Sequence, residues 1–166
     1  MSNPIRIGII GYGNLGRGVE SAISQNDDMT LVGIFSRRDP ASIDSQTQAY
    51  AIDEIMEFKD RVDVMILCGG SATDLPEQGP AFARHFNTVD SYDTHAKIPE
   101  YFEHVNAEAV AGGNVSVIST GWDPGLFSLN RLLGQAILPE GTDHTFWGKG
   151  VSQGHSDAVR RVPGVK

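Results

Sequence analysis

The first residues that could do chemistry form a glycine-rich turn, Gly11-Tyr12-Gly13-Asn14-Leu15-Gly16. The turn follows an apolar run and precedes a segment with apolar residues at helical spacing, which is the context that a dinucleotide-binding turn requires. In such a turn Gly11 permits the tight bend, Gly13 lets the backbone approach a pyrophosphate, and Gly16 lets the helix pack closely on the strand. The helix amino terminus then faces the negative charge of the phosphates. The turn therefore predicts a dinucleotide cofactor.

A second group of residues that could do chemistry directly follows the next apolar run, about 20 residues beyond the glycine turn. It consists of Ser36, Arg37 and Arg38. An NAD site usually carries an acidic residue here for the ribose 2′-hydroxyl, whereas an arginine suits the 2′-phosphate of NADP. The serine adds a hydroxyl donor, and arginine binds phosphate in a planar fork. The alternative interpretation is that Arg37 and Arg38 are ordinary solvated surface residues. No acidic residue lies between the end of this apolar run and Asp39, which favours NADP.

Three further loops follow apolar runs that are typical of buried strands. Ligands of open parallel sheets bind beyond the carboxyl ends of the strands, so we expect these loops to line the cofactor. They comprise Cys68, Gly69, Gly70 and Ser71, then Ser91, Tyr92 and Asp93, and finally Thr120, Gly121, Trp122, Asp123 and Pro124. Trp122 lies in a glycine-rich loop, where a tryptophan shapes a pocket more often than it packs into a core. Cys68 is interpreted as a small buried hydrophobe, because no base is identifiable beside it.

The elements that must position these loops alternate between strand and helix. We expect strands at 5–10, 31–35, 62–68, 88–92 and 115–119, and helices at 15–24, 75–86, 99–111 and 126–137. A short helix is possible near 52–58. Asn14 is expected to cap the first long helix, and Gly112-Gly113 to end the third. The alternation predicts an α/β fold, a Rossmann-type doubly wound parallel sheet with right-handed crossovers.

The pattern changes after 139–141, where a strand at 144–147 is possible. We therefore predict an NADP-binding Rossmann domain at 1–120 and, at 121–166, the incomplete beginning of a second, α+β substrate and dimerisation domain.

Composition narrows the function classes. The 166 residues carry a net charge of −8, from 13 basic and 21 acidic side chains, and such a surface repels nucleic acid. No apolar run approaches the roughly 18 residues that span a bilayer, and the amino terminus lacks a signal-peptide layout. The single cysteine excludes an internal disulfide framework and a multi-cysteine metal site. We expect a soluble cytoplasmic protein without a metal.

Six motifs together resemble the meso-diaminopimelate dehydrogenases, an NADP-dependent family of bacterial lysine biosynthesis. They lie at 11–16, 33–38, 70–74, 119–125, 144–148 and 152–158. The first motif is shared by many dehydrogenases, whereas the last three are long, odd in composition and far more specific. The resemblance runs through almost the whole chain. The family's subunit is about twice as long, so the chain resembles its amino-terminal half.

The resemblance implies oxidation of the D-configured amino acid centre of meso-diaminopimelate. Hydride passes to NADP, and the resulting imine hydrolyses to L-2-amino-6-oxopimelate and ammonia. It also implies that Ser36, Arg37 and Arg38 hold the 2′-phosphate. The substrate contacts that the resemblance implies are Asp93, Asp123, Trp147, Gln153 and Gly154. Trp122, the tryptophan of the glycine-rich loop, is added to them as a residue that shapes the pocket.

Asp93 and Asp123 are the catalytic candidates, since a substrate ammonium needs a carboxylate and imine hydrolysis needs a group that activates water. Either aspartate can take either role, and Asp123 could instead cap the following helix. His95 and His155 are interpreted as loop or structural residues. The expected partners are the small substrate and a second copy of the chain, or the missing carboxyl-terminal half. Another NADP-dependent reductase of similar architecture and a non-catalytic NADP-binding module stay open as alternatives.

Overall fold

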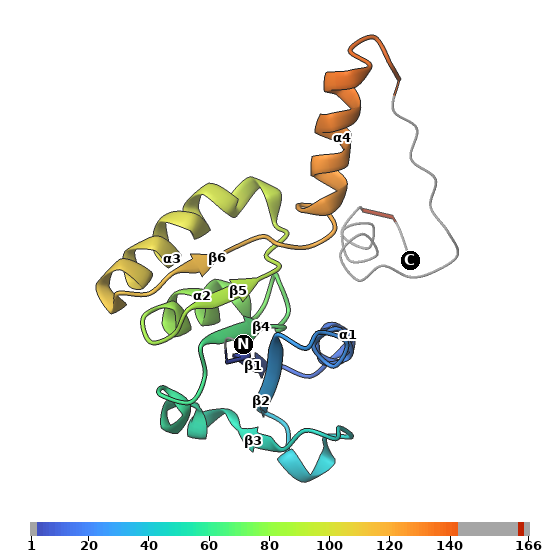
Figure 1. Cartoon of the computed structure of the whole chain (residues 1–166). Helices are drawn as coiled ribbons and strands as arrows, with labels where there is room; N and C mark the ends of the chain where they lie inside the picture. Colours follow the sequence, from blue (N-terminus) through green and yellow to red (C-terminus); the bar gives the residue numbers. More distant parts are fainter. Residues whose placement is uncertain (1–2, 143–162, 165–166) are drawn as a thin grey trace. The chain divides into compact units, whose positions relative to one another are not determined.

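The computed structural model describes residues 3–142 and 163–164. The chain divides into two compact units, residues 1–126 and 127–166. The first unit is built on a six-stranded sheet in the order β3-β2-β1-β4-β5-β6, with every neighbouring pair parallel (Figure 1). The strands are β1 (Ile5–Ile10), β2 (Met29–Ser36), β3 (Ala49–Ala51), β4 (Val64–Leu67), β5 (Thr88–Asp90) and β6 (Ser116–Val117). This order is that of a Rossmann sheet, so the predicted fold class is confirmed.

Helical segments connect the strands. The α-helices are α1 (Asn14–Ile23), α2 (Leu75–Ala83), α3 (Ile98–Gly112) and α4 (Leu126–Ile137). Three short 3₁₀ helices are η1 (Pro40–Ser42), η2 (Ile52–Phe58) and η3 (His95–Lys97). Helix α3 ends as predicted, because Gly113 adopts the left-handed conformation at φ 69° that a helix carboxyl cap favours.

Both faces of the sheet are covered, as the apolar runs of β1 and β2 require. Ile9 pairs with Ile34, and these side chains pack with Ile23 of α1 on one face. Ile10 and its neighbour Phe35 belong to the core on the other face, which includes residues of η2, α2 and α3. All four strand side chains are at most 1% exposed. The alternation of strand side chains therefore directs each to one of two helical layers.

The structure corrects several local predictions. Gly13 is the N-cap of α1 and Asn14 is its first helical residue, so the predicted Asn14 cap is wrong. The glycine turn brings the chain into the helix one residue earlier than the capping pattern indicated. Strand β3 was not predicted, because three residues beside a polar stretch carry no periodic signal. The 62–68 and 115–119 strands are shorter than predicted, at Val64–Leu67 and Ser116–Val117.

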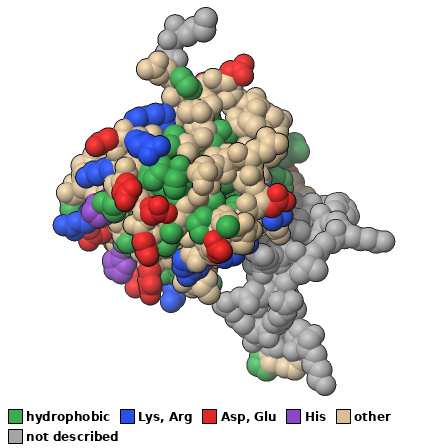
Figure 2. All heavy atoms as spheres, turned by 90° about the horizontal axis from the view of Figure 1, so that it is seen from below, with side chains coloured by type: hydrophobic (Ala, Val, Ile, Leu, Met, Phe, Trp, Pro, Cys, Tyr) green, Lys and Arg blue, Asp and Glu red, His purple; other side chains and the backbone are tan. Residues whose placement is uncertain are grey.

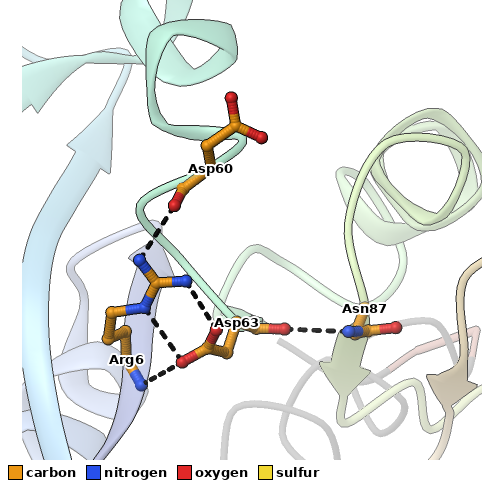
Figure 3. A network of polar contacts seen from close by, with 4 residues as sticks. All are labelled: Arg6, Asp60, Asp63 and Asn87. Atoms are coloured by element: carbon orange, nitrogen blue, oxygen red, sulfur yellow. Dashed lines mark hydrogen bonds and ion pairs between the residues drawn. The ribbon is translucent and has the colours of Figure 1, made fainter.

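A polar network joins the amino-terminal ends of β1, β4 and β5, at the edge opposite the glycine turn (Figure 3). The Arg6 guanidinium donates to Asp63 Oδ1 at 2.7 Å, to Asp63 Oδ2 at 3.1 Å and to the Asp60 carbonyl oxygen at 2.8 Å. Asn87 Nδ2 donates to the Asp63 carbonyl oxygen at 2.9 Å. The hydrogen bonds from Arg6 lower the pKa of Asp63 to about 2. Asp63 thus links the starts of three strands, through its carboxylate to Arg6 of β1 and through its backbone carbonyl oxygen to Asn87 before β5.

Acidic and basic side chains are interspersed over the face of the molecule shown in Figure 2. In the second unit, the Arg131 guanidinium lies 5.6 Å from the centre of the Phe127 ring, one turn earlier in α4. Within the described residues, no helix combines the length and apolarity needed to cross a membrane.

Candidate functional site

A cavity of about 270 Å³ opens at the carboxyl edge of the sheet. Its walls come from the glycine turn after β1, the end of β2 and the loop that joins β4 to α2. The lining residues are Ile10, Gly11, Tyr12, Gly13, Phe35, Ser36, Arg37, Arg38, Ile52, Cys68, Gly69, Gly70, Asp74 and Gln78. Residues from three of the predicted cofactor segments therefore meet at one hollow, as the parallel order of β2, β1 and β4 requires.

The three glycines of the turn have different surroundings. Gly11 has a φ of +88°, and a methyl group there would lie 3.2 Å from the Cys68 backbone. A methyl group on Gly16 would overlap the Gly11 carbonyl oxygen, so this glycine lets α1 start close to the end of β1. A methyl group on Gly13 would meet no atom within 4 Å. The protein itself explains Gly11 and Gly16, while Gly13 leaves open space at the amino terminus of α1.

The two arginines after β2 hold different partners. Arg37 Nη2 lies 2.7 Å from Asp74 Oδ1, and its side chain is 67% exposed. The other oxygen of Asp74 accepts the Gly70 amide N–H at 2.8 Å. Arg38 donates from its guanidinium to the Tyr12 carbonyl oxygen, and its amide N–H donates to Ser36 Oγ at 3.0 Å. Both cations therefore stand at the mouth of the cavity, each linked to a loop on another wall.

Tyr12 anchors the glycine turn rather than exposing its ring. The side chain is 5% exposed, and its hydroxyl donates to Glu20, which also accepts from Ser45 Oγ at 2.6 Å. Burial, reinforced by the hydrogen bond to Glu20, raises the pKa of Tyr12, so the phenol stays a neutral donor. Asn14 and Leu15 follow at the start of α1, and both are exposed.

Cys68 directly follows β4, and its backbone lies next to Gly11 of the glycine turn. It is 8% exposed, and burial raises the pKa of its thiol to about 12. A thiol with this pKa is protonated at neutral pH and is a poor nucleophile. The structure supports the interpretation of Cys68 as a small core residue.

The loops after β5 and β6 lie side by side. The Asp93 amide N–H donates to Ser71 Oγ at 2.9 Å, which ties the loop after β5 to the loop after β4. A methyl group on Gly121 would lie 3.7 Å from Ser91 Cβ, so the loop after β6 adjoins the same segment. The predicted residues of the three loops thus form one continuous edge beside the cavity.

The side chains on this edge differ in exposure. Asp93 is exposed, Asp123 is half-buried and Trp122 is 57% exposed. The Tyr92 ring is 3% exposed and stacks on Tyr101 with 4.1 Å between ring centres. Tyr92 therefore offers a ligand its backbone rather than its ring. Three predicted substrate residues, Trp147, Gln153 and Gly154, lie outside the described residues, as do His155 and the possible strand at 144–147.

The sequence-based reasoning missed five residues of the cavity wall: Ile10, Phe35, Ile52, Asp74 and Gln78. Ile10 and Phe35 were assigned only to buried strands. Asp74 belongs to the motif at 70–74 and directly precedes α2, which is a signal that was present in the sequence. Ile52 and Gln78 lie in helices that pack over the sheet, and nothing in their local sequence distinguishes them from other helical residues. In the part of the chain that the structure describes, no three His, Cys, Asp or Glu side chains gather as a metal site would require.

Known proteins resemble the chain over almost its full length. The family model of the diaminopimelic acid dehydrogenase C-terminal domain matches residues 121–166. The meso-diaminopimelate D-dehydrogenase of Lysinibacillus sphaericus is 69% identical over 164 residues, which are 98% of this chain and 50% of that protein. Over 98% of its length the chain is similar to meso-diaminopimelate D-dehydrogenases. It spans about half the length of the curated relatives that it matches.

Solved structures of a DAP dehydrogenase and of an engineered D-amino acid dehydrogenase share the fold. The C. glutamicum DAP dehydrogenase in complex with DAP is 53% identical and has a TM-score of 0.84, over 98% of this chain and 50% of that one. An engineered D-amino acid dehydrogenase bound to NADP⁺ is 52% identical and has a TM-score of 0.83, over 97% and 50% of the two chains.

Proposed function

We propose that this chain is the NADP-binding part of a meso-diaminopimelate dehydrogenase. The whole protein would oxidise the D-centre of meso-2,6-diaminopimelate to L-2-amino-6-oxopimelate and ammonia, in a reversible reaction of lysine biosynthesis. The observation that carries this proposal is the pair Arg37 and Arg38 at the mouth of a cavity that the open glycine turn also lines. The similarity to meso-diaminopimelate dehydrogenases supports the choice of substrate.

The cavity fits the adenosine end of NADP. Gly13 leaves room for a pyrophosphate at the amino terminus of α1, where backbone N–H groups and the helix dipole favour an anion. Arg37 and Arg38 offer guanidinium forks for the 2′-phosphate, and Ser36 adds its hydroxyl. Tyr12, Asn14, Leu15 and the segment from Cys68 to Ser71 would complete this half of the site.

Loops 91–93 and 120–124 would hold the nicotinamide end and the reacting centre. When bound, NADP accepts the hydride from the D-carbon of the substrate. The substrate amine loses a proton and becomes an imine, water adds to the imine carbon, and ammonia leaves. Asp93 and Asp123 would share two tasks, namely to pair with the substrate ammonium and to take a proton from the attacking water. Trp122, Trp147, Gln153 and Gly154 would shape the substrate pocket.

The remaining predictions extend to the whole protein. Residues 121–166 would begin the substrate and dimerisation domain, which agrees with the start of the matched family model at residue 121. A homodimer, or association with the remaining half of the subunit, would complete the substrate site. A reducing cytoplasm suits a protein with one buried cysteine.

The reaction is tested with this chain joined to the remaining half of the L. sphaericus relative, which we call the completed chain. We expect NADP to be reduced with meso-diaminopimelate, but not with the L,L-isomer, as followed by NADPH absorbance. Asp93→Asn and Asp123→Asn should each lower kcat by about 100-fold or more, which is the usual scale of acid–base catalysis, without a comparable loss of NADP affinity. No NADPH from a completed chain that binds NADP would contradict the substrate assignment.

A further inference from the structure

Asp90, the last residue of β5, is a charged residue in the core. It is 2% exposed, and its carboxylate accepts three hydrogen bonds. Oδ1 accepts the amide N–H groups of Tyr92 at 2.9 Å and Ser119 at 3.0 Å. Oδ2 accepts the Tyr101 hydroxyl at 2.6 Å. Burial of a carboxylate is costly unless its oxygens accept hydrogen bonds, so these three contacts make the buried position of Asp90 possible.

The two amide groups belong to different loops. Tyr92 lies directly before Asp93, in the loop after β5, whereas Ser119 lies directly before the loop 120–124 that contains Asp123. One oxygen atom therefore sets the distance between the two loops. The Asp90 carbonyl oxygen reinforces the link, since it accepts both the amide N–H and Oγ1 of Thr120 at 2.8 Å.

Ser119 shows how tightly this junction is fixed. Its φ is 58°, a conformation that a residue other than glycine rarely adopts. The hydrogen bond from its amide N–H to Asp90 holds it there. The third donor, Tyr101 of α3, keeps its proton, because burial and then the hydrogen bond to Asp90 raise the pKa of its hydroxyl. Asp90 is thus surrounded by donors and is closed to solvent, which leaves no surface for a substrate.

We propose that Asp90 is a positioning residue of the active site: it places the loops carrying Asp93 and Asp123 relative to each other and so aligns the substrate. This inference rests on the proposed function. In positioned catalysis, a displacement of about 1 Å can cost about 100-fold in rate. Because Asp90 is 2% exposed, its contribution would pass through the two loops and not through direct contact with a ligand.

The chain offers a graded set of variants. Asp90→Ala removes every side-chain acceptor. Asp90→Asn keeps one oxygen for the two amide groups and turns an NH₂ group toward Tyr101, whose hydroxyl can then accept. Tyr101→Phe removes the donor to Oδ2 and leaves both loop bonds intact. The third variant is the matched control for a purely structural role, because it disturbs the same buried cluster without releasing the loops.

Two readouts separate this inference from the proposed function. The first is hydrogen–deuterium exchange of the completed chain, which needs no turnover. We expect Asp90→Ala to accelerate exchange in both 91–93 and 119–125 but not in β1, and we expect Asp90→Asn and Tyr101→Phe to leave the two loops close to wild type. Unchanged loop exchange in Asp90→Ala would overturn the positioning role, whether or not the wild type is active.

The second readout is steady-state kinetics with meso-diaminopimelate. Asp90→Ala should lower kcat/KM by about 100-fold while the Kd for NADP changes by less than about 5-fold, and Asp90→Asn should recover most of the loss. Tyr101→Phe should lower Tm without a comparable loss of kcat. An Asp90→Ala that loses no more activity than Tyr101→Phe, or an Asp90→Asn as impaired as Asp90→Ala, would overturn the proposal. If Asp90→Ala does not fold, Asp90→Ser replaces it with the same expectation.

Discussion

Arg37 Nη2 and Asp74 Oδ1 lie 2.7 Å apart and join the end of β2 to the start of α2 across the cavity. Asp74 is the less exposed partner, with 16% of its side chain accessible against 67% for Arg37. Its second oxygen is held by the Gly70 amide. The carboxylate is therefore fixed by the loop after β4, and it restrains one edge of a guanidinium whose remaining N–H groups can meet a phosphate.

Replacement of Arg37 by methionine tests this arrangement. Hydrogen bonds to charged groups contribute about 1.5–3 kcal/mol, so Arg37→Met in the completed chain should raise the Kd for NADP by about 10- to 100-fold. The Kd for NAD should hardly change, because NAD lacks the 2′-phosphate. Both constants are measured by calorimetric titration.

Arg84→Met is the matched control. Arg84 forms an ion pair with Glu108 at 2.7 Å, its side chain is 55% exposed, and it lies outside the cavity. This variant should bind NADP as the wild type does. Equal losses for NADP and NAD in Arg37→Met would show that Arg37 acts through the fold and not through the phosphate.

Gly13 gives a second test, because the fold does not need a glycine there. The space around its Cα is open, so Gly13→Ala should fold with a Tm close to that of the wild type. The added methyl group would occupy the space proposed for the pyrophosphate and should weaken NADP binding by about 10-fold or more, roughly 1.4 kcal/mol.

Two other glycines serve as controls for Gly13→Ala. Gly18→Ala, also in open space but inside α1, should bind NADP normally and gain about 0.5–1 kcal/mol of stability. Gly16→Ala should lose stability, because its methyl group would meet the Gly11 backbone. Normal NADP affinity in Gly13→Ala would place the pyrophosphate elsewhere.

The Arg6–Asp63 pair predicts a pH dependence of stability. The folded-state pKa of Asp63 is about 2, below the ordinary value of about 3.9. A lowered carboxyl pKa stabilises the fold above the ordinary value, and this stability is lost as the pH falls towards the folded-state value. Asp63→Asn should therefore lower the urea midpoint at neutral pH, and its difference from the wild type should shrink from about pH 4 downward.

Asp60→Asn is the control for this measurement, since Asp60 binds Arg6 through its backbone carbonyl and not its carboxyl group (Figure 3). Its urea midpoint should follow the wild type at every pH. Both partners of the Arg6–Asp63 pair are more than 40% exposed, so added salt should also reduce the effect of Asp63→Asn. A difference between Asp63→Asn and wild type that is independent of pH would contradict this account of the network.

Local sequence patterns predicted most of the fold because the buried strands are short apolar runs, each followed by a turn and a helix. Helix α4 has the predicted bounds, and β1 does as well. Strand β3 escaped prediction because Ala49–Ala51 is ordered by its pairing with Ile34, Phe35 and Ser36 rather than by its own sequence.

The placement of residues at the cavity was predictable where it follows from position along the chain, as for Gly13 after β1 and Arg37 after β2. Contacts between distant segments were not. Asp74 lies 37 residues from Arg37, and Asp90 lies 29 residues from Ser119. Only the parallel order of the strands brings these pairs together.

The central claim is that the cavity beside the glycine turn selects NADP through its arginines. Calorimetric titration of the completed wild-type chain with NADP and with NAD tests it most directly. We expect NADP to bind at least about 10-fold more tightly, a difference of about 1.4 kcal/mol that one charge-assisted phosphate contact can supply. Equal affinity for the two nucleotides, or a preference for NAD, would contradict it.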